Sequence, residues 1–383
     1  MRASQLFWHD ASRWSESPGG LERAGLVFYF GTRQMLADGA LYDSLRQRFP
    51  EAHVLGCSTG GQLAGTDVSD DMACALALDF DATTLRVMRA DIAGAADSRA
   101  TGQAIGAGLK GDGLAGVFVL SDGLHVNGSA LVEGIVDAVG RGVPVSGGLA
   151  GDGADFVETL VGCDGPPMPN AIAAVGFYGD AIRIGHGSAG GWDVFGPMRR
   201  ITRADGNVLH EVDGKPALDL YKLYLGPEES QNLPGSALLF PLRIFDPRHP
   251  ERSVVRTILS VDQEAGSMTF AGDMPTGWSA QLMRGNFHRL CAGAAEATQR
   301  AVLDAGSAPD TQSAAIFVSC IGRRLLMGQR IDEEIEAATA ELSEHCLPVG
   351  FYSYGEISPD EESGFCQLHN QTMTVTVLSE EAA

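Results

Sequence analysis

The chain has 383 residues, of which 44% are hydrophobic and 20% charged, and its formal net charge is −22. This length and composition predict a globular protein of two domains, and the negative charge repels phosphate backbones and so excludes nucleic acid as a partner. No apolar run approaches the roughly 20 residues of a membrane span, and the N-terminus does not have the pattern of a signal peptide. We therefore expect a cytoplasmic protein without membrane contact.

A plan of strand, helix and strand recurs three times along the chain. The units run from GLVFYF to HVLGCSTGGQLAG, from GVFVLSDG to VPVSGGLAGDG, and from AAIFVSCIGRR to CLPVGFYSYGEISP. In each unit the apolar residues of the middle segment are three and four apart, which is typical of a helix that crosses between parallel strands. The pattern predicts an α/β fold of two domains, with mixed sheets flanked by helices. Asn127 or Ser129 is expected to begin the second of these helices, and Asp332 the third.

Between the second and third units the chain changes to alternating strands. RRITRADGNVLHEV predicts a hairpin, and a helix should follow that begins near Pro216 and ends at Gly226. GPEESQNLPGSA is a polar stretch typical of a linker. These features divide the chain into an extension (1–22), an N-terminal domain (23–225), a linker (226–236) and a C-terminal domain (237–383).

Glycine-rich turns follow the second strand of each unit. Open α/β sheets bind ligands beyond the carboxyl ends of their strands, so these turns are the candidate binding site. The interpretation that each glycine only makes a tight turn stays open for any single turn. The candidate ligand-binding residues are Cys57, Ser58, Asp122, Asp152, Trp192, Arg323, Tyr354 and Glu356.

Two short motifs match catalytic patterns but not their context. GCSTG places Ser58 in the G-x-S-x-G pattern of a serine hydrolase. In such enzymes a helix begins directly after the serine, and the sequence that follows Ser58 is a poor helix start. Hydrolysis at Ser58 remains an alternative, and the favoured interpretation is a protein that is not an enzyme. GDGLAG lies ahead of a strand and cannot hold a pyrophosphate at a helix terminus. The seven cysteines include no C-x-x-C pair, so neither disulfides nor a zinc site is expected.

Taken together, these motifs resemble the FIST sensory module, a bacterial input domain with N-terminal and C-terminal parts. The resemblance rests on the glycine turns quoted above, on IGHGSAGGWDVFGP and ITRADGNVLHEVDGKPALDLYKLYLG, and on GNFHRLCAGAA, FVSCIGRR and VGFYSYGEISP, over roughly residues 23–365. It implies a sensor whose ligand is either an amino acid or haem with nitric oxide. Because no residues remain for an output domain, we expect a separate signalling partner, such as a histidine kinase or a diguanylate cyclase.

The haem alternative centres on His186 in IGHGSAGGWD. A five-coordinate haem needs one imidazole, an apolar wall and little bulk beside the ring. His186 could be the axial ligand, the surrounding glycines the clearance, and Trp192 the wall. The chain has no C-x-x-C-H motif, so such a haem b would be held without thioether links.

The amino-acid alternative needs a cation for a carboxylate and an acid for an ammonium group. Arg323 or Arg324 could supply the first, and Asp152 or Glu356 the second. Tyrosines 352 and 354 could line the pocket. A scaffold that binds only protein, through its acidic surface, is a further alternative.

Overall fold

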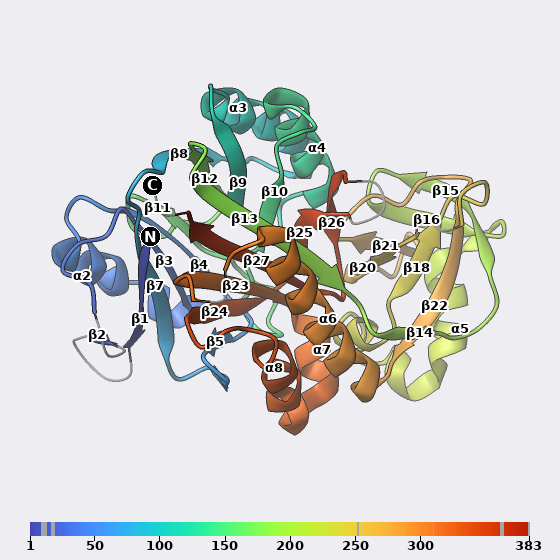
Figure 1. Ribbon diagram of the computed structural model, residues 1–383. Helices are drawn as coiled ribbons and strands as arrows, with labels where there is room; N and C mark the ends of the chain where they lie inside the picture. Colours follow the sequence, from blue (N-terminus) through green and yellow to red (C-terminus); the bar gives the residue numbers. More distant parts are fainter. Residues whose placement is uncertain (9–13, 17–19, 251–252, 309, 361–363, 382–383) are drawn as a thin grey trace.

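The computed structural model describes residues 1–8, 14–16, 20–250, 253–308, 310–360 and 364–381. It confirms the predicted α/β class, with three six-stranded sheets and one nine-stranded sheet in the described parts of the chain (Figure 1). None of the helices formed by these residues has the length and apolar composition needed to cross a membrane.

The first sheet contains the first predicted unit. Its strands, in spatial order, are β11 (Val161–Cys163), β4 (His53–Ser58), β3 (Leu26–Gly31), β7 (Ala73–Asp79), β1 (Arg2–Trp8) and β2 (Trp14–Glu16). β3 and β4 are parallel, and α1 (Arg33–Leu36) and α2 (Ala40–Arg48) connect them, as predicted. β1 pairs with β7 from Arg2 opposite Asp79 to Trp8 opposite Ala73. The segment expected to be an extension thus contributes two strands, β1 and β2, to this sheet.

The second sheet contains the second unit. Its order is β26 (Cys366–His369), β25 (Gly355–Pro359), β10 (Val145–Leu149), β9 (Leu114–Ser121), β12 (Ala171–Tyr178) and β8 (Thr84–Asp91). The parallel strands β9 and β10 are joined by α4 (Gly128–Val139), against which α3 (Ser98–Leu109) packs. Asn127 caps α4, because its side chain accepts a hydrogen bond of 3.2 Å from the Ala130 amide.

The third sheet contains the third unit, together with strands from earlier in the chain. Its order is β13 (Ile182–Ala189), β27 (Met373–Glu380), β23 (Ser313–Cys320), β24 (Cys346–Ser353), β5 (Gln62–Ala64) and β6 (Asp67–Ser69). β23 and β24 are parallel, and α7 (Ile321–Met327) and α8 (Ile331–Thr339) lie between them in sequence. α8 begins at Ile331, one residue before the predicted start. The second and third sheets therefore mix strands from both predicted domains.

The nine-stranded sheet forms a separate lobe, at the right of Figure 1. Seven of its strands are β19 (Ser253–Arg256), β18 (Leu242–Phe245), β22 (Ser279–Gly285), β15 (Arg199–Asp205), β16 (Val208–Val212), β21 (Ser267–Phe270) and β20 (Ile258–Asp262), while β14 (Trp192–Val194) pairs with β22 and β17 (Lys215–Pro216) with β16. The predicted hairpin is present as β15 and β16. The helix α5 (Ala217–Ser230) continues past Gly226, where the backbone is kinked at φ 82°. The segment expected to be a linker thus begins inside this helix.

Aromatic side chains from all three six-stranded sheets meet in one core. The rings of Phe28 and Phe118 are 5.0 Å apart, and those of Phe30 and Phe351 are 4.7 Å apart. All four are at most 1% exposed. Burying such a side chain stabilises a fold by about 1.5–3 kcal/mol, so this core fixes the three sheets against one another.

Candidate functional site

Residues that follow four strand ends line one cavity of about 490 Å³, which we call the turn cavity. The strands are β3, β4, β10 and β23, which belong to the parallel pairs of three different sheets. The carboxyl ends of these strands therefore converge. The predicted glycine turns after β4 and β10 line the cavity, whereas the third, after β24, contributes no lining residue, and its unit takes part through the segment that follows β23. The lining residues are Thr32, Arg33, Gln34, Thr59, Gly60, Asp70, Asp152, Gly153, Ala154, Asp155, Ile321, Arg324, Leu325, Gly328 and Ile331.

Backbone hydrogen bonds hold the turns together at the cavity. The Gly60 amide donates to the Tyr352 carbonyl at 2.7 Å, and the Gly151 amide donates to the Ser58 carbonyl at 2.9 Å. A Cβ atom on Gly60 would lie 2.5 Å from Cδ1 of Ile321, and one on Gly151 would lie 3.0 Å from the Gly60 amide nitrogen. A side chain at Gly151 would press against the backbone of the Gly60 turn, whereas one at Gly60 would require the Ile321 side chain to move.

Arg324 forms one charged wall of the turn cavity. Its guanidinium donates to both carboxylate oxygens of Asp70 at 2.7 Å and also to the Gly60 carbonyl. Burial lowers the pKa of Arg324, but the hydrogen bonds and the charge of Asp70 outweigh this effect and leave the pKa above its ordinary value. Asp70 is 55% exposed, so the pair contributes at most about 1 kcal/mol to folding.

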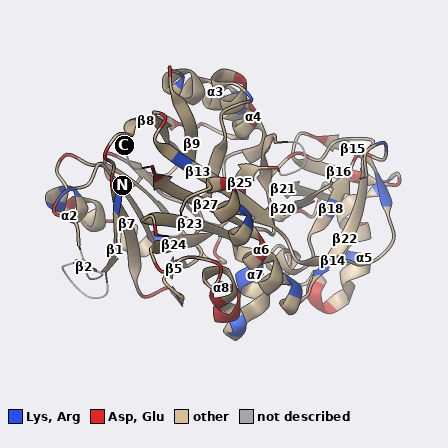
Figure 2. Cartoon of the chain, viewed as in Figure 1, with Lys and Arg blue, Asp and Glu red and all other residues tan. Residues whose placement is uncertain are grey.

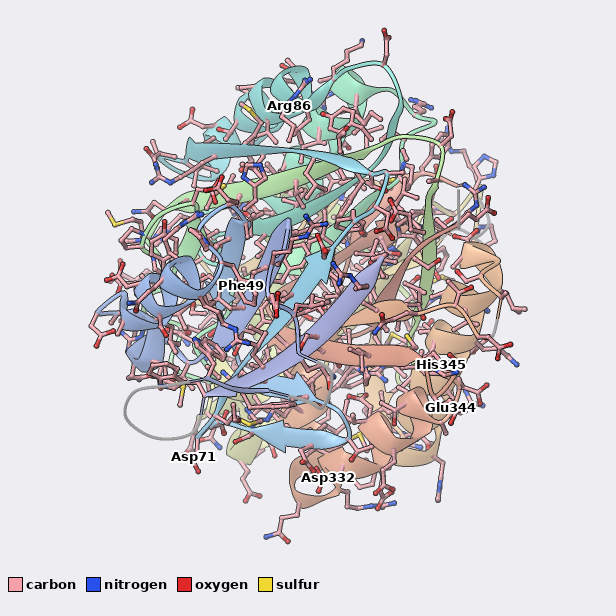
Figure 3. All side chains as sticks on the ribbon, turned by 60° about the vertical axis from the view of Figure 1, so that its left-hand side comes forward. Phe49, Asp71, Arg86, Asp332, Glu344 and His345 are labelled. Atoms are coloured by element: carbon pink, nitrogen blue, oxygen red, sulfur yellow. The ribbon has the colours of Figure 1, made fainter. Side chains whose placement is uncertain are left out.

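Arg33 forms the other basic wall and has fewer partners. Its Nε atom is buried and has no hydrogen-bond partner among the described residues, and its guanidinium lies 3.8 Å from the Asp155 carboxylate. An unpaired buried donor costs about 1–3 kcal/mol, so an acceptor that reached Arg33 Nε would relieve this cost. Asp70, Asp152 and Asp155 also line the cavity. Asp71 and Asp332, each next in sequence to a lining residue, are exposed and lie toward the lower edge of the molecule in Figure 3.

Cys57 and Ser58 lie at the end of β4 but do not face the cavity. The Cys57 side chain is fully buried, which raises the pKa of its thiol well above the ordinary range. The Ser58 hydroxyl is buried and accepts a hydrogen bond of 2.9 Å from the Leu160 amide. The chain continues from Ser58 into strand β5 and not into a helix. Ser58 therefore does not have the strand-to-helix geometry of a hydrolase nucleophile.

Asp152 lines the cavity, but its carboxylate organises a turn. It accepts hydrogen bonds from the backbone amides of Phe156, Val157 and Glu158 and from the hydroxyl of Tyr354. The rings of Phe156 and Tyr354 stack with centroids 4.6 Å apart. These contacts occupy both carboxylate oxygens of Asp152, so it is a positioning residue for the turn.

Asp122 has a similar role after β9. Its carboxylate accepts from the backbone amides of Leu124 and His125 and from the Thr159 hydroxyl. With its side chain 1% exposed, Asp122 fixes the turn and does not reach the cavity.

Arg323 lies behind the cavity and is fully buried. Its guanidinium pairs with the buried Glu334 at 2.6 Å and donates to the carbonyls of Gly190 at 2.9 Å and Leu290 at 2.8 Å. These partners belong to α8, to the connection between β13 and β14, and to α6 (Phe287–Ala305). A fully desolvated guanidinium with these partners joins three elements to α7 and is not available to a ligand.

Trp192 and Glu356 are also part of this buried junction. Trp192 Nε1 donates to the Gln371 carbonyl at 2.9 Å, and the same carbonyl accepts from Arg323. The Glu356 carboxylate accepts from the hydroxyls of Ser353 and Thr372 at 2.7 and 3.0 Å. Burial raises the pKa of Glu356 to about 8, although these hydrogen bonds oppose the shift.

The glycines around His186 face a helix. Added Cβ atoms on Gly185 and Gly187 would each lie 2.0 Å from a backbone carbonyl of α6, at Ala301 and Ala297. The His186 side chain is 7% exposed, and its Nδ1 lies 3.6 Å from the Asp304 carboxylate. The space that the sequence suggested for a porphyrin is filled by α6, so this segment does not fit haem in the way that was expected. Among the described residues, no group of three His, Cys, Asp or Glu side chains is arranged to hold a metal ion.

Sequence reasoning named Asp152 and Arg324 on the cavity wall but missed Arg33, Asp70 and Asp155. Arg33 directly follows the first strand end of the first unit, a signal that the same argument could have used. Asp70 lies beyond the β5–β6 hairpin, and nothing in its sequence context indicates that it reaches Arg324. Its position depends on the pairing of β5 with β24, which joins residues far apart in the chain.

The fold and the cavity define a class of protein: a two-part α/β protein whose parts share sheets, with an open cavity where its repeated units meet. Residues 25–215 match the model of the FIST N domain, and residues 217–359 match that of the FIST C domain. The chain belongs to the FIST family of sensory domain proteins. It is also similar to the uncharacterized protein MJ1623 of Methanocaldococcus jannaschii, at 24% identity over 382 residues that cover 89% of this chain and 70% of the other.

Proposed function

We propose that this protein is a sensor that binds an amino acid in the turn cavity and signals through a separate protein, such as a histidine kinase or a diguanylate cyclase. The observation that carries the proposal is Arg33, a residue of the cavity lining whose Nε has no hydrogen-bond partner among the described residues and whose contact with Asp155 is long, at 3.8 Å. A ligand carboxylate would accept from Arg33 in a charge-assisted, bidentate pair. The ammonium group would lie against Asp155, which lines the same cavity.

A ligand in the turn cavity would contact residues of both family domains. Thr32, Arg33 and Asp155 come from the FIST N domain, whereas Ile321, Arg324 and Leu325 come from the FIST C domain. A ligand that contacts both walls stabilises the arrangement of the two parts in which those walls are correctly spaced. A sensor needs such a differential affinity between two states.

The helix α7 provides a route from the cavity to the rest of the molecule. Arg324 on α7 lines the cavity, and the adjacent Arg323 is bonded to α6, α8 and the β13–β14 connection. Gln371, which accepts from Arg323, donates to the Leu238 carbonyl next to the nine-stranded lobe. A shift of α7 on ligand binding would therefore be transmitted to that lobe.

The proposal is tested by thermal unfolding of the purified protein with each proteinogenic amino acid. We expect at least one amino acid to raise the melting temperature, since a ligand that binds only the folded state stabilises it. Arg33→Ala should abolish this response. Arg183→Ala removes an exposed, ion-paired arginine elsewhere and should keep it. A flat response across the panel would refute the proposal.

A further inference from the structure

The two family domains contribute walls of different character to the turn cavity. The FIST N domain supplies the lining residues that follow β3, β4, β6 and β10, and apart from glycines and Ala154 their side chains are all polar or charged. The FIST C domain supplies three large apolar side chains, Ile321, Leu325 and Ile331, together with Arg324 and Gly328. The cavity therefore has a polar wall on one domain and a largely apolar wall on the other.

One face of α7 forms most of the apolar wall. Residues 321, 324 and 325 line the cavity, and their spacing of three and four places them on the same face of the helix. Ile321 is 2% exposed and Ile331 8%, whereas Leu325 is 41% exposed. Leu325 is therefore the apolar side chain of this wall that a ligand can contact most readily.

The charged residues of α7 and α8 are either paired or absent from the lining. Figure 2 shows basic residues on α7 and acidic residues on α8. On α7, Arg323 is buried behind the cavity, and Arg324 is paired with Asp70. The acidic residues of α8 are not lining residues. The side chains that remain for a ligand on this wall are those of isoleucine and leucine.

Most polar side chains of the opposite wall already have partners within the protein. The Thr32 hydroxyl accepts from a backbone amide at the start of α1 at 3.3 Å, and the Thr59 hydroxyl donates to a backbone carbonyl at 3.3 Å. The carboxylate of Asp152 accepts from three backbone amides. Gln34 is exposed, so its amide exchanges water for a ligand with little gain.

The most loosely paired charges of the lining are Arg33 and Asp155, 3.8 Å apart. They suffice for one carboxylate and one ammonium group, which all amino acids share. A polar or charged side chain on the ligand would then lose water without gaining an unpaired partner, which is unfavourable. An apolar side chain would instead bury its surface against Ile321 and Leu325, which is favourable in proportion to the area buried.

We propose that the turn cavity selects amino acids with an apolar side chain, such as leucine. The inference rests on the proposed function, because it takes Arg33 and Asp155 as the partners of the carboxylate and ammonium groups. The ligand side chain lies against the face of α7, and Leu325 is a specificity-determining residue. Only a ligand whose side chain reaches α7 joins the two family domains, so the same contact selects the ligand and favours one arrangement of the domains.

The test is isothermal titration of the purified full chain with leucine, asparagine and aspartate. The side chains of these amino acids have the same branched shape and differ in polarity. We expect leucine to bind at least about tenfold more tightly than either of the others, because the polar side chains give up hydrogen bonds to water. Binding of asparagine or aspartate as tight as that of leucine would overturn the inference.

A charge placed on the apolar wall should change this preference. In Leu325→Lys the affinity for leucine should fall by about tenfold or more, and the affinity for aspartate should rise, because the new ammonium group pairs with the ligand side chain. Leu303→Lys alters an apolar residue of α6 that is 74% exposed and does not line the cavity, and it should keep the wild-type affinities. An unchanged order of affinities in Leu325→Lys would contradict the role of Leu325.

The outcomes separate this inference from the proposed function. Tighter binding of aspartate than of leucine, lost in Arg33→Ala, would overturn the apolar selection and leave the sensor proposal standing. Leucine binding that Arg33→Ala does not weaken would overturn the assignment of the cavity as the site. If none of the proteinogenic amino acids binds, both proposals are wrong.

Discussion

Two glycine-rich regions of this molecule both allow close packing of the backbone, but only one of them leaves a cavity. At the turn cavity, Gly60 and Gly151 let several turns approach one another and leave a charged hollow in front of them. In β13, Gly185 and Gly187 let α6 lie directly on the strand, and the space is filled. α6 allows this contact because it presents small residues such as Ala297 and Ala301. Glycine content alone therefore does not distinguish a binding site from close packing. The residues opposite the glycines determine whether the space beside them is open or filled.

The largest change in stability is expected at Arg323, behind the cavity, and the adjacent Arg324, on the cavity wall, provides the comparison. Arg323→Met leaves the buried Glu334 carboxylate without its ion-pair partner and should lower the free energy of unfolding by about 3–5 kcal/mol. Arg324→Met removes a partly exposed pair and should cost at most about 1 kcal/mol. Urea denaturation of both variants measures the difference. Equal losses of unfolding free energy in the two variants would contradict the assignment of Arg323 to a buried junction and of Arg324 to the cavity wall.

The second prediction tests the packed glycines. Gly185→Ala places a methyl group against the backbone of Ala301 and Ala305, which cannot yield as a side chain can, and should cost about 3 kcal/mol of unfolding free energy. A Cβ on Gly190 would meet nothing within 4 Å, so Gly190→Ala is the matched control and should change stability by less than about 1 kcal/mol. If both variants unfold at the same denaturant concentration, the segment is not packed on α6.

The third prediction concerns Glu356 in the buried junction. Its pKa is raised to about 8 in the folded protein from an ordinary value of 4.5, so the folded state binds the proton more tightly than the unfolded state. The stabilising contribution is complete below the unfolded pKa and is lost as the pH rises through 8, at about 1.4 kcal/mol per pH unit. Glu356→Gln should therefore show a flatter decline of stability than wild type between pH 5 and pH 8, measured by urea denaturation. Parallel curves for the two proteins would contradict the shift.

Much of the fold was predictable because its signals are local. The three strand-helix-strand units, the Asn127 cap and the hairpin of β15 and β16 each follow from spacing within a short segment. The positions of the glycines also predicted that the turns after β4 and β10 meet at one cavity, but the third glycine turn, after β24, does not line it. The mixing of strands from both predicted domains was not, because pairings such as that of β10 with β25 join segments about 200 residues apart.

Individual site residues were harder to predict, because neighbouring side chains point in different directions. Arg323 and Arg324 are identical in type and adjacent in sequence, yet one is fully buried and the other lines the cavity. Asp152 and Glu356 carry the charge expected for an ammonium partner, but hydrogen bonds within the protein occupy both. The fold shows that, of the two arginines among the described cavity residues, Arg33 has the weaker charged contact, at 3.8 Å from Asp155, and an Nε without a hydrogen-bond partner.

The most direct test of the sensor proposal is isothermal titration of the wild type and Arg33→Ala with the amino acid that gives the strongest thermal response. Loss of a charge-assisted pair is worth about 1.5–3 kcal/mol, so affinity should fall by about 10- to 100-fold in Arg33→Ala and by less in Arg33→Lys. Equal affinities in wild type and Arg33→Ala would show that the ligand binds elsewhere and would contradict the assignment of the turn cavity as the sensing site.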